Sequence, residues 1–243
     1  MPQKVVLITG GSRGIGAAAA KLLGAEGWAV AVNYVANEAA ARTTAAAVET
    51  AGGAAMIIQG DTGKATDITA MFDAVDAKWG RLDALVNNAG IIGPRGPFDA
   101  LTPDDMQKVL AINVVGYMLC AQAAIPRFVA VGGGSIVNIS SGSAITGGAG
   151  EQILYSVSKG GVNSLGIGLS QELGPLGIRV NTVSPGLTRT DMPTAAKLAQ
   201  GANASPLGRV GEAEEVAEGI VWLLSDKASF TAGANLRISG GRP

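Results

Sequence analysis

Short apolar runs rich in β-branched residues alternate along this chain with longer stretches of helical composition, and this alternation restricts the possible folds. Each run is apolar at consecutive positions, so both faces of the strand that it predicts must be covered. Strands of this kind, separated by helices, form a parallel sheet between two helical layers. The predicted strands are residues 5–9, 29–33, 54–59, 82–87, 135–140, 179–184 and 235–239. We therefore predict an α/β fold with a seven-stranded parallel sheet and helices on both faces.

The segments between these strands carry the end signals of helices. The strongest start is Thr102-Pro103-Asp104-Asp105, which supplies an N-cap, a proline in the first turn and acids at the positive end of the helix dipole. Gly80 marks the end of another helix. The predicted helices are residues 16–23, 38–50, 67–79, 102–124, 155–173 and 212–224. Since no linker-like stretch interrupts the alternation, residues 1–243 are expected to form one domain.

Composition argues against several classes of function. The net charge is −1 and no basic run stands out, which argues against a nucleic-acid partner. The chain has no histidine, so catalytic mechanisms and metal sites that require one are excluded. Cys120 is the single cysteine and forms no internal disulfide, which fits a cytoplasmic location. We expect no membrane association, because signal-peptide features and long uninterrupted apolar runs are missing.

A glycine-rich loop follows the first predicted strand. It reads Thr9-Gly10-Gly11-Ser12-Arg13-Gly14-Ile15-Gly16 and leads into the first predicted helix. Glycines let the backbone approach a pyrophosphate, and a helix N-terminus adds free N–H groups and a favourable dipole. A tight strand-to-helix turn is the simpler alternative. The place of the loop at the start of an α/β domain favours dinucleotide binding and hence a Rossmann fold.

Tyr155 and Lys159 lie four residues apart in a predicted helix, so they share one face of it. An ammonium beside a phenol favours the phenolate and lowers the phenol pKa from its usual value of about 10. A phenol tuned in this way can donate or accept a proton in catalysis. The same spacing also arises from a surface lysine beside a half-buried tyrosine, so its meaning depends on the other motifs.

Taken together, these motifs resemble the short-chain dehydrogenase/reductase family over essentially the whole chain. The other segments that carry the resemblance are Asn87-Asn88-Ala89-Gly90, Asn113, Ser140-Ser141, Pro185-Gly186 and Ile238-Ser239-Gly240-Gly241. The resemblance implies hydride transfer between a nicotinamide cofactor and a carbonyl or secondary alcohol, without a metal. It also implies a homotetramer built through the helix that carries Tyr155 and through the C-terminal strand.

The resemblance assigns four catalytic residues. Tyr155 is the general acid/base, and Lys159 lowers its pKa and holds the nicotinamide ribose. Ser141 positions the substrate oxygen, and Asn113 completes a proton relay. A structural amide with its hydrogen bonds satisfied is the alternative for Asn113, and the role in the relay is favoured.

The identity of the catalytic serine depends on a loop length. In most members of the family the serine precedes the tyrosine by thirteen residues, a spacing that falls here on Gly142. The strand end at Ser140-Ser141 matches the family motif, so we infer one inserted residue within 142–154. The role is therefore assigned to Ser141, with Ser143 as the alternative.

The resemblance also predicts the cofactor contacts. They are Gly10, Ser12, Arg13, Gly14, Ile15, Gly16, Asn33, Tyr34, Asp61, Thr62, Asn88, Ala89, Gly90, Tyr155, Lys159, Pro185, Gly186, Thr188 and Thr190. Tyr34 stands where NAD-dependent members carry an acid for the ribose hydroxyls. Arg13 can pair with a 2′-phosphate, although a solvent-exposed loop arginine is the alternative. We expect NADP(H) to be preferred, with NAD(H) possible.

The substrate is expected under a loop at residues 188–206, which carries a short apolar helix. Residues 91–98 and 142–154 form the other walls, with Glu151 and Gln152 as polar contacts. The overall likeness is to 3-oxoacyl-carrier-protein reductases and glucose-type dehydrogenases. Acidic carrier proteins dock on a pair of basic residues in those reductases. This chain offers only Arg127 for that pair. A non-catalytic NADP-binding regulator is a further alternative, which the presence of both Tyr155 and Lys159 disfavours.

Overall fold

The computed structural model describes residues 3–242 and confirms the predicted parallel sheet. The strands run in the order β3-β2-β1-β4-β5-β6-β9, and every neighbouring pair is parallel. Their bounds are β1 (Val5–Ile8), β2 (Ala29–Tyr34), β3 (Ala54–Gln59), β4 (Ala84–Asn87), β5 (Gly134–Ile139), β6 (Ile178–Pro185) and β9 (Asn235–Ile238). A separate parallel pair, β7 (Thr188–Arg189) and β8 (Gly211–Glu212), lies beyond the sheet.

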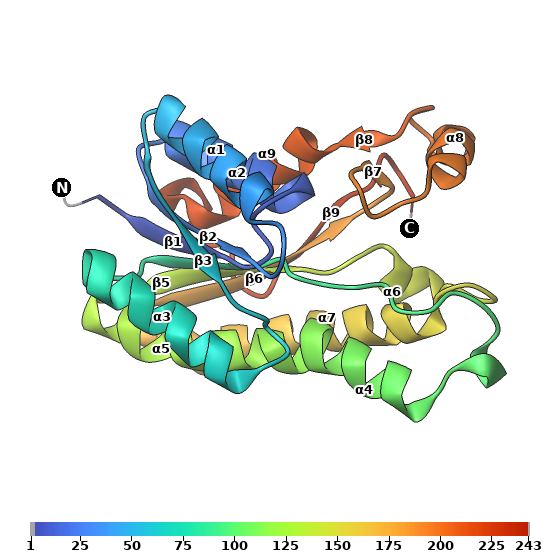
Figure 1. The fold of residues 1–243 in the computed structure, drawn as a ribbon, viewed down its shortest axis with the longest axis horizontal. Helices are drawn as coiled ribbons and strands as arrows, with labels where there is room; N and C mark the ends of the chain where they lie inside the picture. The colour runs from blue at the N-terminus through green and yellow to red at the C-terminus, as the bar shows by residue number, and fades with distance from the viewer. Residues whose placement is uncertain (1–2, 243) are drawn as a thin grey trace.

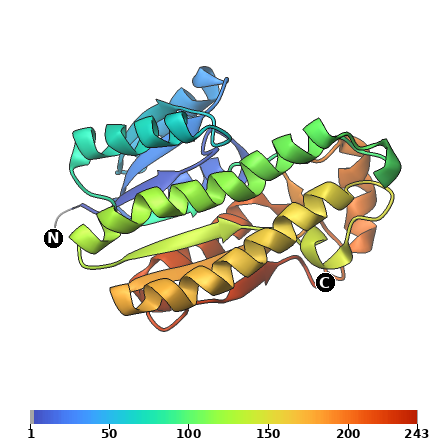
Figure 2. The same cartoon turned by 90° about the horizontal axis from the view of Figure 1, so that it is seen from below.

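Helices cover both faces of the sheet (Figure 1). On one face lie α1 (Gly14–Ala25), α2 (Glu38–Thr50) and α9 (Ala213–Leu224). On the other lie α3 (Ala65–Trp79), α5 (Gly116–Ala130) and α7 (Ile153–Leu173). Figure 2 shows α5 and α7 side by side across this second face. The remaining helices, all outside these two layers, are α4 (Pro103–Leu110), α6 (Ser143–Thr146) and α8 (Ala195–Ala204).

The two-sided burial follows from the strand sequences. In β1, Val6 and Ile8 enter the core beneath α1 and α9, whereas Val5 and Leu7 enter the core beneath α3 and α5. Successive side chains of a strand point to opposite faces, so a continuously apolar strand supplies both cores at once. For this reason apolar and polar residues do not alternate along these strands.

The long helix predicted from Thr102 is interrupted by a π-helical turn. Thr102 caps α4 as expected, because its hydroxyl accepts from the Asp105 N–H and the Asp105 carboxylate accepts from the Thr102 N–H. The helix then passes through a π-helical turn, Ala111–Val115, before α5 begins. A π-turn of this kind often marks a functional site. Asn113 lies at its centre, fully buried.

The stretch Pro103–Ala130 is also long and apolar enough to span a membrane by length and composition alone. In the fold it is a core helix. Cys120, Ala124 and Phe128 are buried against the sheet in the second core. Enclosure raises the pKa of the Cys120 thiol to about 12, so the thiol stays protonated and packs as a small apolar group.

The order in which the strands are added to the sheet reverses between β1 and β4. From β1 the chain builds outward through β2 to β3, and it then continues on the other side with β4. Loops that follow these two neighbouring strands therefore diverge. Ligands of open α/β sheets bind at such a reversal point.

Candidate active site

The glycine loop is held to the sheet by a buried amide. The Asn33 side chain accepts a hydrogen bond from the Gly10 N–H (2.9 Å) and donates one to the Gly60 carbonyl (2.9 Å). Asn33 is fully buried, so its side chain positions the loop from within the fold. Gly10 and Gly14 have positive φ angles of 61° and 55°, which explains glycine at both positions.

The segment after β4 locks onto the same loop. The Thr9 hydroxyl accepts from the N–H groups of Asn88 (2.9 Å) and Ala89 (3.1 Å). In return the Asn88 amide donates to the carbonyls of Thr9 and Gly10, both at 3.0 Å. A Cβ on Gly16 would lie 2.7 Å from the Asn88 amide nitrogen and 2.8 Å from the Gly10 carbonyl oxygen. The loop therefore depends on glycine at position 16.

The loop leaves the start of α1 open to an anion. No side chain caps this helix N-terminus, and its first turn carries no acid. Free N–H groups at a helix N-terminus attract phosphate. Thr190 lies across from the loop, since a Cβ on Gly14 would be 3.2 Å from its methyl group. A pyrophosphate fits the glycine loop by this chemistry, with Thr190 on the opposite side.

Two further predicted cofactor residues, Asp61 and Thr62, follow β3. The Asp61 carboxylate accepts from the Gly63 N–H (2.9 Å), and Thr62 is buried. The structure thus brings this turn and the glycine loop to the same edge of the sheet, since β3, β2 and β1 are consecutive neighbours.

The residues around the expected 2′-phosphate position differ in their exposure and in their ion pairing. Tyr34 is 7% exposed and packs into the core beneath α1 and α9. Arg13 points outward, with a weak ion pair to Asp191 at 3.7 Å. Glu38, the first acid after β2, is paired with Arg42 at 2.5 Å. Arg13 is therefore an exposed and weakly paired cation beside the glycine loop, because both members of its ion pair are exposed.

Tyr155 and Lys159 share one buried face of α7, with exposures of 8% and 3%. The Lys159 Nζ lies 5.8 Å from the centre of the Tyr155 ring. Its hydrogen bonds go to the Ile139 carbonyl (2.7 Å) and to the Tyr117 hydroxyl (3.1 Å). Sequence reasoning missed Tyr117. Its four-residue spacing from Asn113 placed it near the site, but nothing in the sequence showed that its hydroxyl faces the lysine.

Burial governs the pKa values of this pair. It raises the pKa of Tyr155, and the hydrogen bond from Ser141 offsets part of that rise. It lowers the pKa of Lys159 to about 7. The expectation that the pKa of Tyr155 is lowered is therefore wrong, because burial of the phenol is the largest cause of its shift. Burial also lowers the pKa of the Lys159 amine, and its hydrogen bonds go to other groups.

The two candidate serines have different partners. The Ser141 side chain hydrogen-bonds Tyr155 and also accepts from the Ser143 N–H at 3.1 Å. The Ser143 hydroxyl instead accepts from the Gln152 amide at 2.7 Å. Geometry thus brings Ser141 to the tyrosine and turns Ser143 toward the start of α7.

Asn113 connects three parts of the site. Its amide accepts from the Ile91 N–H (2.9 Å) and donates to the Ile91 carbonyl (2.8 Å) and to the Ser158 hydroxyl (3.0 Å). Gly90 lies beside both the Asn113 amide and the Lys159 amine. A Cβ at position 90 would lie 3.2 Å from the Asn113 side-chain oxygen and 3.5 Å from the Lys159 Nζ. Asn113 and Lys159 are thereby neighbours.

The segment after β6 closes the site. The Pro185 carbonyl accepts from the Gly142 N–H (3.0 Å), and the Gly186 N–H donates to Ile238 on β9 (2.9 Å). Thr188 is buried and donates to the Gly186 carbonyl at 3.1 Å. This segment therefore stands beside the serine loop, with Thr190 reaching the glycine loop.

An ion cluster joins the three expected walls of the substrate site. Glu151 accepts from Arg95 in residues 91–98 and from Lys197 on α8 at 2.9 Å. Hydrogen bonding to Lys197, more than any other interaction, lowers the pKa of Glu151. Glu151 and Gln152 were expected as polar contacts for a substrate, and both side chains are occupied by protein partners. Arg95 and Lys197 are the basic groups that sequence reasoning missed.

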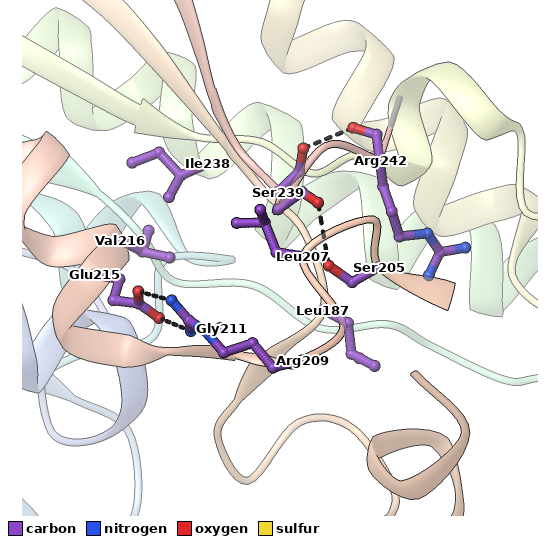
Figure 3. Close-up of a pocket in the computed structure, with 11 residues that line it drawn as sticks. Leu187, Ser205, Leu207, Arg209, Gly211, Glu215, Val216, Ile238, Ser239 and Arg242 are labelled. Atoms are coloured by element: carbon purple, nitrogen blue, oxygen red, sulfur yellow. Dashed lines mark hydrogen bonds and ion pairs between the residues drawn. The ribbon is translucent and has the colours of Figure 1, made fainter. Parts of the chain in front are cut away.

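A cavity of about 110 Å³ lies away from these residues, beneath the C-terminal segment (Figure 3). Its polar groups are paired with one another. Arg209 forms a two-pronged ion pair with Glu215, and the Ser205 hydroxyl donates to the Gly240 carbonyl. These contacts join the segment at residues 205–209 to α9 and to the C-terminal segment. Among residues 3–242, no cluster of three or more metal-ligating side chains occurs.

Comparisons with known proteins agree with this geometry. The family described as Enoyl-(Acyl carrier protein) reductase matches residues 10–242. The chain belongs to the short-chain dehydrogenase/reductase family. It is therefore related to oxidoreductases over its whole described length.

Particular relatives cover nearly the full chain. The uncharacterized oxidoreductase YgfF of Escherichia coli K12 is 43% identical, over 98% of this chain and 99% of that protein. The 3beta-hydroxysteroid dehydrogenase 1 of Eggerthella lenta is 39% identical, over 98% and 93%. A short chain dehydrogenase from Burkholderia cenocepacia J2315, solved in complex with NADP, is 36% identical with a TM-score of 0.94, over 99% and 98% of the two chains.

The crowding at Gly16 generates a test of the glycine loop. Gly16→Ala should weaken NADPH binding about tenfold or more, because the new methyl displaces Asn88 or the Gly10 carbonyl. Fluorescence titration of the purified protein measures this. Gly168→Ala is the matched control, since a Cβ there meets nothing within 4 Å. Equal NADPH affinities in the two variants would contradict the assignment.

Proposed function

We propose that this protein is an oxidoreductase that transfers a hydride between NADP(H) and a carbonyl or secondary alcohol. The observation that carries the proposal is the buried Tyr155, which has Ser141 at its hydroxyl and Lys159 behind its ring. This group lies at the same sheet edge as the open glycine loop. A proton donor beside a dinucleotide site is the arrangement that carbonyl reduction requires.

Each residue has a distinct role in the proposed reduction. When bound, the nicotinamide supplies the hydride. Tyr155 donates its proton to the carbonyl oxygen, and its raised pKa keeps that proton in place until it is needed. Ser141 donates a hydrogen bond to the same oxygen and stabilises the charge that develops there. Lys159, whose pKa is about 7, can return a proton to Tyr155 near neutral pH.

NADP(H) is the proposed cofactor because of the charges around the end of β2. Arg13 is exposed and only weakly paired, so it is free to meet a 2′-phosphate. Tyr34 is buried and replaces the acid that would repel such a phosphate. The solved relative with bound NADP supports the same choice.

We propose that residues 188–206 cover the substrate, with α8 as a lid. The Lys197–Glu151 pair ties α8 to the loop that precedes Tyr155. The hydroxysteroid dehydrogenase relative supports a secondary alcohol as the reacting group. A 3-oxoacyl-carrier-protein substrate has less support, because Arg127 is held by Asp76 at 2.6 Å and stacks 5.1 Å from the Phe72 ring. It is therefore not a free cation for an acidic carrier.

The proposed assembly is a homotetramer. Large apolar side chains are exposed on the outer surfaces of the π-helical turn, α5 and α7, among them Val115, Met118, Val157 and Ile167. Exposed apolar faces of neighbouring helices favour association.

The role of Tyr155 is tested by removing its hydroxyl. Tyr155→Phe should lower kcat by about a hundredfold to ten-thousandfold, since the proton donor is lost. The Kd for NADPH should change little, because the ring remains. Stopped-flow or steady-state reduction of a carbonyl panel, with NADPH binding in parallel, measures both. The panel should hold ring ketones, sugars and 3-oxoacyl thioesters. Turnover like that of the wild type in this variant would refute the proposed acid.

The cofactor preference is tested at Arg13. Arg13→Ala should raise the Kd for NADPH about tenfold or more, because a charge-assisted contact is lost, and should leave NADH nearly unaffected. Arg237→Ala, an exposed arginine on the edge strand β9, is the control. An equal effect of Arg13→Ala on both cofactors would show that this residue does not read the 2′-phosphate.

Light scattering of the purified protein tests the assembly. The expected mass is about four times that of the 24.2 kDa chain. Val157→Glu should reduce that mass, because a charge would replace an exposed apolar contact on α7. A wild-type protein that stays monomeric at micromolar concentration would count against the homotetramer.

A further inference from the structure

Lys159 has a second aromatic neighbour besides Tyr155. Tyr117, in the first turn of α5, is 1% exposed and has the largest volume among the fully buried side chains. The Lys159 Nζ donates to its hydroxyl at 3.1 Å and lies 4.9 Å from its ring centre. The amine is thus nearer the centre of the Tyr117 ring than that of the Tyr155 ring, which is 5.8 Å away.

Three groups form a closed triangle of hydrogen bonds. Tyr117 donates its hydroxyl proton to the Ile139 carbonyl at 3.1 Å, and Lys159 donates to the same carbonyl at 2.7 Å. A phenol has one hydrogen, and here it is committed to Ile139. A lone pair of the Tyr117 oxygen is therefore left facing the amine. Burial raises the pKa of Tyr117 well above its usual range, so the phenol stays neutral and keeps this orientation.

Among the residues that the structure describes, the groups that face the amine carry no compensating negative charge. From its own helix it faces the Tyr155 phenol, and from α5 it faces Tyr117, with the Cys120 thiol behind that ring. Strand β5 contributes the neutral Ile139 carbonyl, and the π-helical turn contributes the neutral Asn113 amide near Gly90. Among the described residues, the charged form of Lys159 therefore depends on neutral acceptors.

We propose that Tyr117 is a positioning residue for the reaction, whose hydroxyl fixes the Lys159 amine behind Tyr155 and stabilises its charged form. The inference rests on the proposed function, because it gives Lys159 the task of returning the proton. Loss of the hydroxyl leaves the ammonium with one fewer acceptor in a buried site. The ammonium form is then less stable relative to the amine.

The decisive measurement is the Lys159 pKa in the purified protein without cofactor. Tyr117→Phe keeps the ring and the packing and removes only the hydroxyl. In an NMR titration of carbon-13 labelled lysine, the Lys159 pKa should fall by roughly one unit in this variant. Cys120→Ala, one helical turn further along α5, is the control and should leave the Lys159 pKa unchanged. An unchanged Lys159 pKa in Tyr117→Phe would overturn the proposal.

The wild-type protein provides a second test that needs no variant to fold. The chain has three tyrosines, so their ring signals can be resolved after tyrosine labelling. The Tyr117 signals should move with the same midpoint as Lys159, because the hydroxyl accepts from the titrating group. Tyr117 signals that stay fixed while Lys159 titrates would overturn the contact.

Activity separates this inference from the proposed function. Carbonyl reduction should decline above the Lys159 pKa, and in Tyr117→Phe the decline should move to lower pH by the shift that NMR measures. At low pH the two proteins should have nearly equal kcat. An equal loss of kcat at all pH values would indicate that Tyr117 has only a structural role, and it would overturn the proposal that Tyr117 positions Lys159. A wild-type protein inactive on the whole panel would refute the proposed function, and the NMR result would still decide the Tyr117–Lys159 contact.

Discussion

A lysine that is 3% exposed draws its hydrogen-bond acceptors from the protein, because an unpaired buried polar group is costly. For Lys159 these acceptors come from two other elements, the Ile139 carbonyl at the end of β5 and the Tyr117 hydroxyl on α5. The hydrogen bonds of Lys159 therefore depend on how α7 packs against β5 and α5. Burial also brings the lysine pKa to about 7, so the amine can both give and take a proton near neutrality.

The cofactor side of the site is supported in a comparable way by buried polar groups. Asn33 holds the glycine loop from β2, and Asn88 holds it from the end of β4. The Asn88 contacts cross from the end of β4 to the loop after β1, where the order of the sheet reverses, and the Asn33 contact joins β2 to the same loop. The π-helical turn brings Asn113 to Ile91 and Ser158, which links the loop after β4 to α7. The fold therefore positions the site through hydrogen-bonded side-chain amides, of which Asn33 and Asn113 are fully buried and Asn88 is half-buried.

Much of the fold could be predicted because its signals are local. All seven strands lie within two residues of their predicted bounds, since a continuously apolar run identifies a strand buried on both faces. The Thr102 cap was equally readable, because capping uses neighbouring residues. Prediction failed where a property depended on enclosure. The pKa of Tyr155 rises where a fall was expected, because the phenol is itself enclosed by the fold.

The sequence by itself determined the strand–helix order, the glycine loop and the candidate group of Asn113, Ser141, Tyr155 and Lys159, since each is carried by residue type and short spacing. Tertiary structure alone decided which serine meets the tyrosine, because an inserted residue in a loop does not reveal where the hydroxyls turn. It also decided that Tyr117 faces Lys159 across 42 positions of chain. Such contacts depend on how helices pack on a sheet, and packing is not encoded in the spacing of a motif.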